Sequence, residues 1–178
     1  KNNQTKQLTL IPEVEAKTVK RYTYQAQKDP RTVAVTVTFR NDKGSGLGIP
    51  LPAGKFRIYK ADDDGALVFL GEDEIQHTPK DEDVKLTIGK AFDIVGERQV
   101  LQERRPGKRS REQDIEIKIR NHKKDAVKVS VIESHFGSWE IKSQSMRPRS
   151  QNARQIEWEL TVPADGEMVL TYTYRQNY

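Results

Sequence analysis

Residues 114–131 read DIEIKIRNHKKDAVKVSV, and this stretch decides the fold class. Residues 115–119 place isoleucine at every second position between charged residues, and residues 127–131 place valine in the same way between polar ones. Because successive side chains of a strand point to opposite faces, the alternation predicts strands with one buried and one solvated face. The polar segment 121–125 then predicts a short loop that joins two strands.

The same period of two recurs outward from this stretch, in residues 33–40, 156–162 and 168–174. β-Branched and aromatic residues, which fit a pleated half-buried surface, crowd these runs. Ten to twelve strands are expected, with helix below about 10% of residues. The pattern predicts an all-β chain: an antiparallel β-sandwich with an immunoglobulin-like C-terminal part, built as one or two sandwich subdomains.

Turn and boundary signals lie between the runs. Residues 62–65 (DDDG) and 163–166 (PADG) each place glycine where a left-handed residue would close a hairpin. The basic segment RRPGKRSR at 104–111 contains a Pro-Gly pair and is the best internal boundary. The expected organisation is an N-terminal β-rich subdomain over 1–103, a basic loop or linker over 104–111, and an immunoglobulin-like part over 112–178. The alternative is a long loop within one continuous sandwich.

Composition limits the class of protein. At 34% hydrophobic and 32% charged residues, the chain suits thin β layers in which every second residue faces water. No cysteine is present, so disulfides and thiolate metal sites are excluded. No run approaches the roughly 20 apolar residues of a membrane helix. The opening KNNQTKQ has no apolar core of a signal peptide, so the chain is interpreted as a fragment or mature form of a longer protein.

A family resemblance is carried by short motifs, most of them between residues 51 and 98, and runs over most of the chain. The motifs are LPAG at 51–54, RIY at 57–59, GED at 71–73, HTPKD at 77–81, AFDIVGER at 91–98, RNHK at 120–123 and VPADGE at 162–167. With these motifs the chain resembles the C-terminal β-rich module of bacterial mucoidy-inhibitor-like envelope proteins, the domain of unknown function 4139 family. The resemblance implies a periplasmic or secreted location and a link to exopolysaccharide production, but no established activity.

Two groups of residues are candidates for ligand binding. The first is a cluster of positive charge that could hold an anionic partner such as an acidic polysaccharide: Arg104, Arg105, Lys108, Arg109 and Arg111. A solvated loop is the alternative. The second is an aromatic platform for sugar made of Tyr22 and Tyr24, which share a strand face; burial in the core is its alternative. Nucleic acid is not expected as a partner, because no aromatic residue separates the arginines.

No catalytic residue is expected. The glycines at 44–48 lack the spacing of a dinucleotide loop, and no phosphate-loop motif is present. Ser134 and His135 are adjacent, but neighbours on a strand point to opposite faces, which argues against a nucleophile–base pair. Without pocket geometry, the many carboxylates do not define a glycosidase dyad.

No metal or cofactor is expected either. The three histidines lie far apart and lack zinc-ligand spacing, so His77 and His122 are expected to bond the backbone of their turns. A loose calcium cage of Asp62, Asp64 and Glu72 is the alternative to a solvated hairpin tip.

The expected function is that of a non-enzymatic binding or scaffolding module of a bacterial cell-envelope protein, with a protein or polysaccharide partner. The alternative is a carbohydrate-active hydrolase, which a concave cleft with two carboxylates and an exposed tryptophan would favour. Flat faces with an uncovered strand edge would favour the binding module. One core is expected to contain Ile117, Val129, Trp158, Leu160 and Tyr172.

Overall fold

The computed structural model describes residues 11, 13–61 and 65–178. Within these residues the chain forms eleven strands and one turn of 3₁₀ helix, η1 (Lys43–Ser45), so the all-β class is confirmed. The strands are β1 (Val19–Tyr24), β2 (Thr32–Arg40), β3 (Gly54–Ala61), β4 (Leu67–Ile75), β5 (Asp83–Gly107), β6 (Ser110–Asn121), β7 (Val127–Ser134), β8 (Ser138–Gln144), β9 (Ser150–Gln151), β10 (Gln155–Val162) and β11 (Gly166–Asn177).

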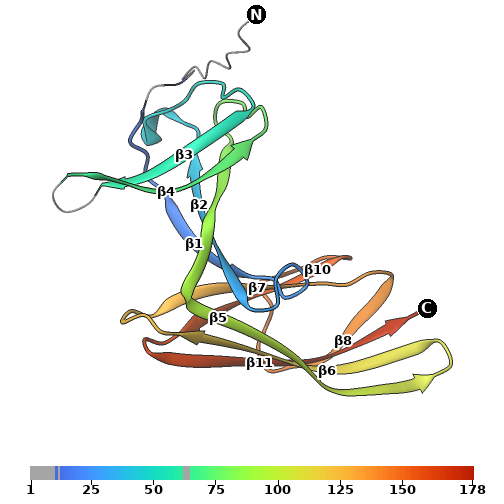
Figure 1. The fold of residues 1–178 in the computed structure, drawn as a ribbon. Helices are drawn as coiled ribbons and strands as arrows, with labels where there is room; N and C mark the ends of the chain where they lie inside the picture. Colours follow the sequence, from blue (N-terminus) through green and yellow to red (C-terminus); the bar gives the residue numbers. More distant parts are fainter. Residues whose placement is uncertain (1–10, 12, 62–64) are drawn as a thin grey trace, which may run out of the picture.

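Nine strands form one sheet in the order β8-β11-β6-β5-β2-β1-β7-β10-β9, and β3 pairs with β4 separately. The large sheet folds back on itself, so that β5, β6 and β11 face β7 and β10 across a shared core (Figure 1). The sandwich is therefore confirmed. It is not purely antiparallel, because β1 pairs with β7 in parallel.

The core of the sandwich contains the residues that the alternation predicts. Ile117, Val129, Trp158 and Leu160 are fully buried, and Tyr172 is nearly so. All five belong to one cluster, in which β6 and β11 pack against β7 and β10. The buried faces of β6, β7, β10 and β11 were therefore assigned correctly from the period of two.

A second, smaller cluster lies beneath the β3–β4 hairpin. Val37 and Phe39 from β2 and Val84 and Leu86 from β5 are buried there, together with Leu51 and Ile75. The same two strands also enter the sandwich core, through Val33 and Ile94. Figure 1 shows β2 and β5 running from the hairpin region into the sandwich. The two clusters thus share strands.

The basic segment 104–111 is a hairpin and not the expected loop or linker. Strand β5 continues to Gly107, which pairs with Ser110 at the start of β6, and the turn between them contains only Lys108 and Arg109. Acidic residues across the pair bind two of the arginines: Arg104 pairs with Glu112 and Asp114, and Arg111 pairs with Glu103. The boundary expected at this segment is therefore wrong.

The two glycine turns differ in their role. Strands β3 and β4 form the expected hairpin, with Gly65 at a φ of 83°, whereas Asp62, Asp63 and Asp64 lie outside the described residues. Residues 163–166 do not close a hairpin, because β10 and β11 belong to opposite layers and are not paired. The left-handed residue there is Asp165, with a φ of 46°, and not the glycine.

The loop after β6 also crosses between layers, since β6 and β7 are not neighbours in the sheet. Buried Asn121 joins the two crossing loops: its side-chain amide donates to the carbonyls of Asp125 and Pro163, both at 2.9 Å. Its side-chain oxygen accepts from the backbone N–H of Lys123 at 3.0 Å. In the described part of the chain, no helix is long and apolar enough to span a membrane.

Candidate functional site

The basic hairpin presents fewer available charges than the sequence suggests. The Arg104 guanidinium donates to both oxygens of Asp114 at 2.8 Å and to Glu112 at 3.0 Å. Arg111 pairs with Glu103 at 2.5 Å. Arg105, Lys108 and Arg109 are exposed, and their side chains make no ion pair with any described residue. Three of the five predicted residues therefore remain available to an anionic partner.

The aromatic platform expected at Tyr22 and Tyr24 is wrong. Tyr24 is fully buried, and its hydroxyl donates to the carbonyl of Pro30 at 2.8 Å. Burial, followed by the charge of Glu133, raises the pKa of Tyr24 to about 12. Tyr22 packs against the same core. The two rings share one face, as expected, but that face points inward.

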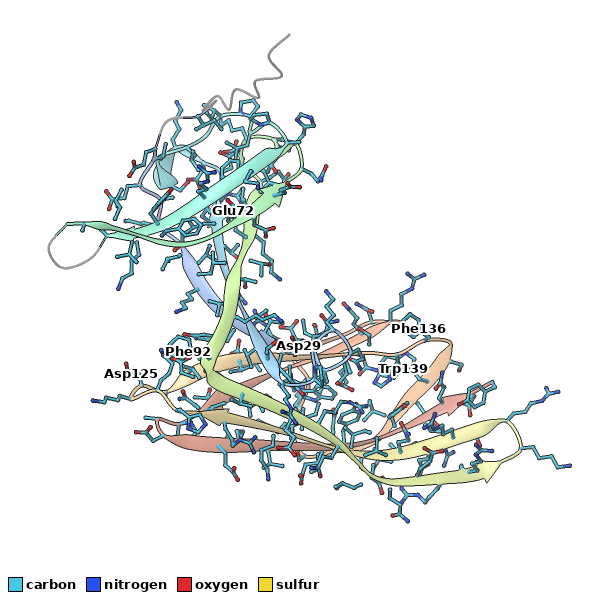
Figure 2. The ribbon with its side chains drawn as sticks, in the orientation of Figure 1. Asp29, Glu72, Phe92, Asp125, Phe136 and Trp139 are labelled. Atoms are coloured by element: carbon cyan, nitrogen blue, oxygen red, sulfur yellow. The ribbon has the colours of Figure 1, made fainter. Side chains whose placement is uncertain are left out.

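Exposed aromatic residues occur instead at the loop between β7 and β8. Phe136 is 76% exposed, and Trp139 at the start of β8 is half-buried. Figure 2 shows both at one end of the sandwich, with Phe92 on the opposite side. We call this region, made of residues 135–139 with the adjoining turns at 25–31 and 151–154, the aromatic end.

Two open hollows flank Phe136 and Trp139. One, of about 490 Å³, is lined by Trp139 and by the polar residues Ser138, Gln151 and Asn152. The other, of about 450 Å³, lies between the β1–β2 turn, β5, β7 and the end of β11. Its lining combines the rings of His135, Phe136 and Tyr174 with the polar side chains of Arg98, Gln27, Ser134 and Gln176.

Hydrogen bonds to two segments, the turn at 153–154 and the end of β11, hold the β7–β8 loop in place. The Trp139 indole N–H donates to the carbonyl of Ala153 at 2.8 Å, and Gln176 Nε2 donates to the carbonyl of Phe136 at 2.9 Å. The backbone N–H of His135 donates to Arg154 at 2.9 Å. The exposed ring of Phe136 therefore sits on a preformed loop, next to the half-buried ring of Trp139 in β8.

His135 lies under this loop, between the rings of Trp139 and Tyr174, whose centroids are 4.7 and 4.3 Å from its own. Burial, followed by the positive charge of Arg98, lowers the pKa of His135 to about 4, so the imidazole is neutral at neutral pH. Its Nε2 has no partner among the described residues. The hydroxyl of neighbouring Ser134 accepts from Gln25 instead, so the two residues form no nucleophile–base pair.

A buried ion pair lies beside the second hollow. Glu133 is fully buried, and its Oε2 accepts from Arg98 Nε at 2.9 Å and from the Tyr172 hydroxyl at 2.5 Å. Burial lowers the pKa of Arg98, but the combined interactions with the Glu133 carboxylate and the Tyr172 hydroxyl raise it overall. Burial and then the same carboxylate raise the pKa of Tyr172.

The sequence contains a feature that indicates this ion pair, although the alternation of apolar residues does not reveal it by itself. Glu133 occupies the inward register of β7, two residues after buried Val131. A buried carboxylate is tolerated only when a positive charge and hydrogen bonds compensate for its lost hydration. An acidic residue in the apolar register therefore indicates a buried cation, which here is Arg98. Which arginine supplies it depends on strand order, and strand order was not predicted.

The remaining histidines fit the expectation in part. His77 Nδ1 accepts from the backbone N–H of Ala53 at 3.2 Å, so it bonds the backbone of a distant segment and not that of its own turn. For His122 only the backbone N–H is seen to bond, to Asp93 at 2.8 Å. No group of three or more potential metal ligands exists in residues 11, 13–61 and 65–178. Two members of the calcium alternative, Asp62 and Asp64, lie outside the described residues.

The chain was compared with protein-family models, with curated proteins and with solved structures, and none of the three comparisons found a match.

Proposed function

We propose that the chain is a non-enzymatic binding module that takes a segment of polysaccharide at the aromatic end. The observation that carries this proposal is the position of Phe136, on a preformed loop, and of Trp139, at the start of β8, between two open hollows that polar side chains help to line. Aromatic rings offer an apolar face to the C–H groups of a sugar, and amide side chains both donate to and accept from its hydroxyls. Gln151 and Asn152 line one hollow, and Gln27 and Gln176 line the other.

The cellular setting is proposed from the resemblance of residues 51–98 to an envelope family. A periplasmic or secreted location would bring the module into contact with surface polysaccharide. The fold itself does not point to an activity, because β-sandwiches carry many unrelated functions.

The described lining favours binding over hydrolysis. A glycosidase needs two carboxylates that flank the scissile bond. Neither hollow has an acidic residue among its described lining residues. The nearby carboxylate of Glu133 is fully buried and paired with Arg98, so a sugar cannot reach it without the ion pair opening.

The proposal is tested by titrating the chain with a neutral cello-oligosaccharide and with an oligogalacturonate of the same length. Phe136→Ala should weaken the binding of whichever sugar binds by about twofold to tenfold, the range expected for one aromatic contact. Phe92→Ala is the matched control, because Phe92 is 93% exposed on the opposite side of the sandwich. If neither sugar binds, or if the two variants bind like wild type, the aromatic end is not a sugar site.

A further inference from the structure

The second hollow and the tip of the β5–β6 hairpin form one continuous strip. Gln176, which lines the hollow, pairs with Arg111 across the β11–β6 ladder, and Asn177 pairs with Ser110. The backbone N–H of Tyr178 then donates to the carbonyl of Arg109 at 2.9 Å. Three successive residues therefore lead from the hollow to the turn at the tip. Figure 1 shows β11 ending beside this hairpin, which projects beyond the rest of the sandwich.

The tip carries an excess of positive charge. The nearby acids are already paired: Glu103 with Arg111, Asp114 with Arg104, and Glu112 with both Arg104 and Arg175. The three exposed residues Arg105, Lys108 and Arg109 lack such partners in the part of the chain that the structure describes. Clustered charge of one sign attracts counter-ions and raises the local concentration of an anionic ligand.

We infer that the ligand of the aromatic end is an acidic polysaccharide, whose chain runs from the second hollow along β11 and β6 to the basic tip. This inference rests on the proposed function and adds the substrate class. The hollow would hold one sugar unit against Phe136, and the tip would attract the carboxylates of later units. A flat anionic membrane could touch a projecting tip, but it would not fill a recess between four segments of the sandwich.

The test is a triple variant, Arg105→Gln, Lys108→Gln and Arg109→Gln. It leaves the Arg104 and Arg111 ion pairs in place, so the hairpin should keep its fold. The matched control removes the same charge elsewhere through Lys60→Gln, Lys85→Gln and Lys124→Gln, three exposed lysines on β3, on the distant part of β5 and in the β6–β7 loop. Both triple variants have the same net charge.

For the tip variant, affinity for oligogalacturonate should fall about fivefold to tenfold at low ionic strength, as three exposed charge pairs would give. The difference from wild type should shrink as salt rises, because exposed charges are screened. Affinity for the neutral cello-oligosaccharide should stay unchanged, and the control variant should bind oligogalacturonate like wild type.

Three results would overturn the inference. The tip variant could bind oligogalacturonate like wild type, or the control variant could lose as much affinity as the tip variant. The tip variant could also lose binding only to vesicles of phosphatidylcholine and phosphatidylglycerol, which would assign the tip to a membrane surface. Suppose that the tip variant binds oligogalacturonate like wild type but Phe136→Ala weakens sugar binding. The proposed function then stands, and only the assignment of an acidic polysaccharide as the ligand fails. If wild type binds neither sugar, the proposed function fails as well.

Discussion

At the residue scale, the buried pair of Glu133 and Arg98 is the most constrained feature of the molecule. Glu133 is fully buried, and Arg98 and Tyr172 satisfy one of its two carboxylate oxygens. A buried ion pair adds little net stability over an apolar pair, but removal of one partner leaves an uncompensated charge. The pair therefore fixes how β5 packs against β7 next to the proposed site.

Arg98→Met should lower the free energy of unfolding by about 3–5 kcal/mol, because Glu133 is then buried without a cation. Urea denaturation measures the loss. The double variant Arg98→Met with Glu133→Leu should recover most of it, since no charge remains buried. Arg120→Met, which breaks the more exposed pair with Glu97, should cost about 1 kcal/mol or less. Equal costs for the two single variants would contradict burial of the Glu133 carboxylate.

His135 should make stability depend on pH. Its pKa in the folded chain is lowered to about 4, against an ordinary value of 6.5, so the fold favours the neutral form. The stability that depends on neutral His135 is fully present above pH 6.5 and is lost as the pH falls toward 4. At pH 5 the free energy of unfolding should be lower by about 2 kcal/mol. His135→Phe should flatten the profile of unfolding free energy between pH 7 and 5. If the unfolding free energy of His135→Phe still falls between pH 7 and 5 as steeply as in wild type, another group is responsible for the pH dependence.

At the element scale, the period of two identified the strands and the core faces, but it did not identify the partners. Residues 121–125 and 163–166 have the length and composition of hairpin loops, yet both cross between the layers. Loop length does not distinguish a hairpin loop from a loop that crosses between the layers, because the outcome depends on which distant strands pair. The Tyr22–Tyr24 platform failed for a related reason: alternation shows which residues share a face, not that the face is exposed.

The close approach of β5 and β1 depends on a glycine. A Cβ atom at Gly96 would overlap the buried ring of Tyr24, which cannot move aside within the core. Gly96→Ala should therefore cost about 1–3 kcal/mol, as overpacking does. Gly54→Ala is the control, because a Cβ there meets no atom within 4 Å, and its effect should stay within about 0.5 kcal/mol. Thermal unfolding of both variants decides the point; similar melting temperatures would mean that β5 does not approach Tyr24 so closely.

At the scale of the whole molecule, β2 and β5 join the small cluster under the β3–β4 hairpin to the sandwich core. The sequence predicted the all-β sandwich and the five core residues, because both follow from local alternation. The site could be predicted only in part: the basic tip was visible as a run of charge, but its ion pairs depend on cross-strand register. Phe136 and Trp139 were missed as a site because the hollows around them arise from segments far apart in the chain.

The proposed strip, from the aromatic end to the hairpin tip, should bind an acidic polysaccharide along its whole length. The most direct measurement is a titration of the ¹⁵N-labelled chain with oligogalacturonate, followed by amide chemical shifts. We expect saturable shifts concentrated in residues 107–111, 135–139 and 176–178, with residues 65–75 and 122–126 unaffected. Shifts confined to those latter segments, or no saturable shift at all, would contradict it.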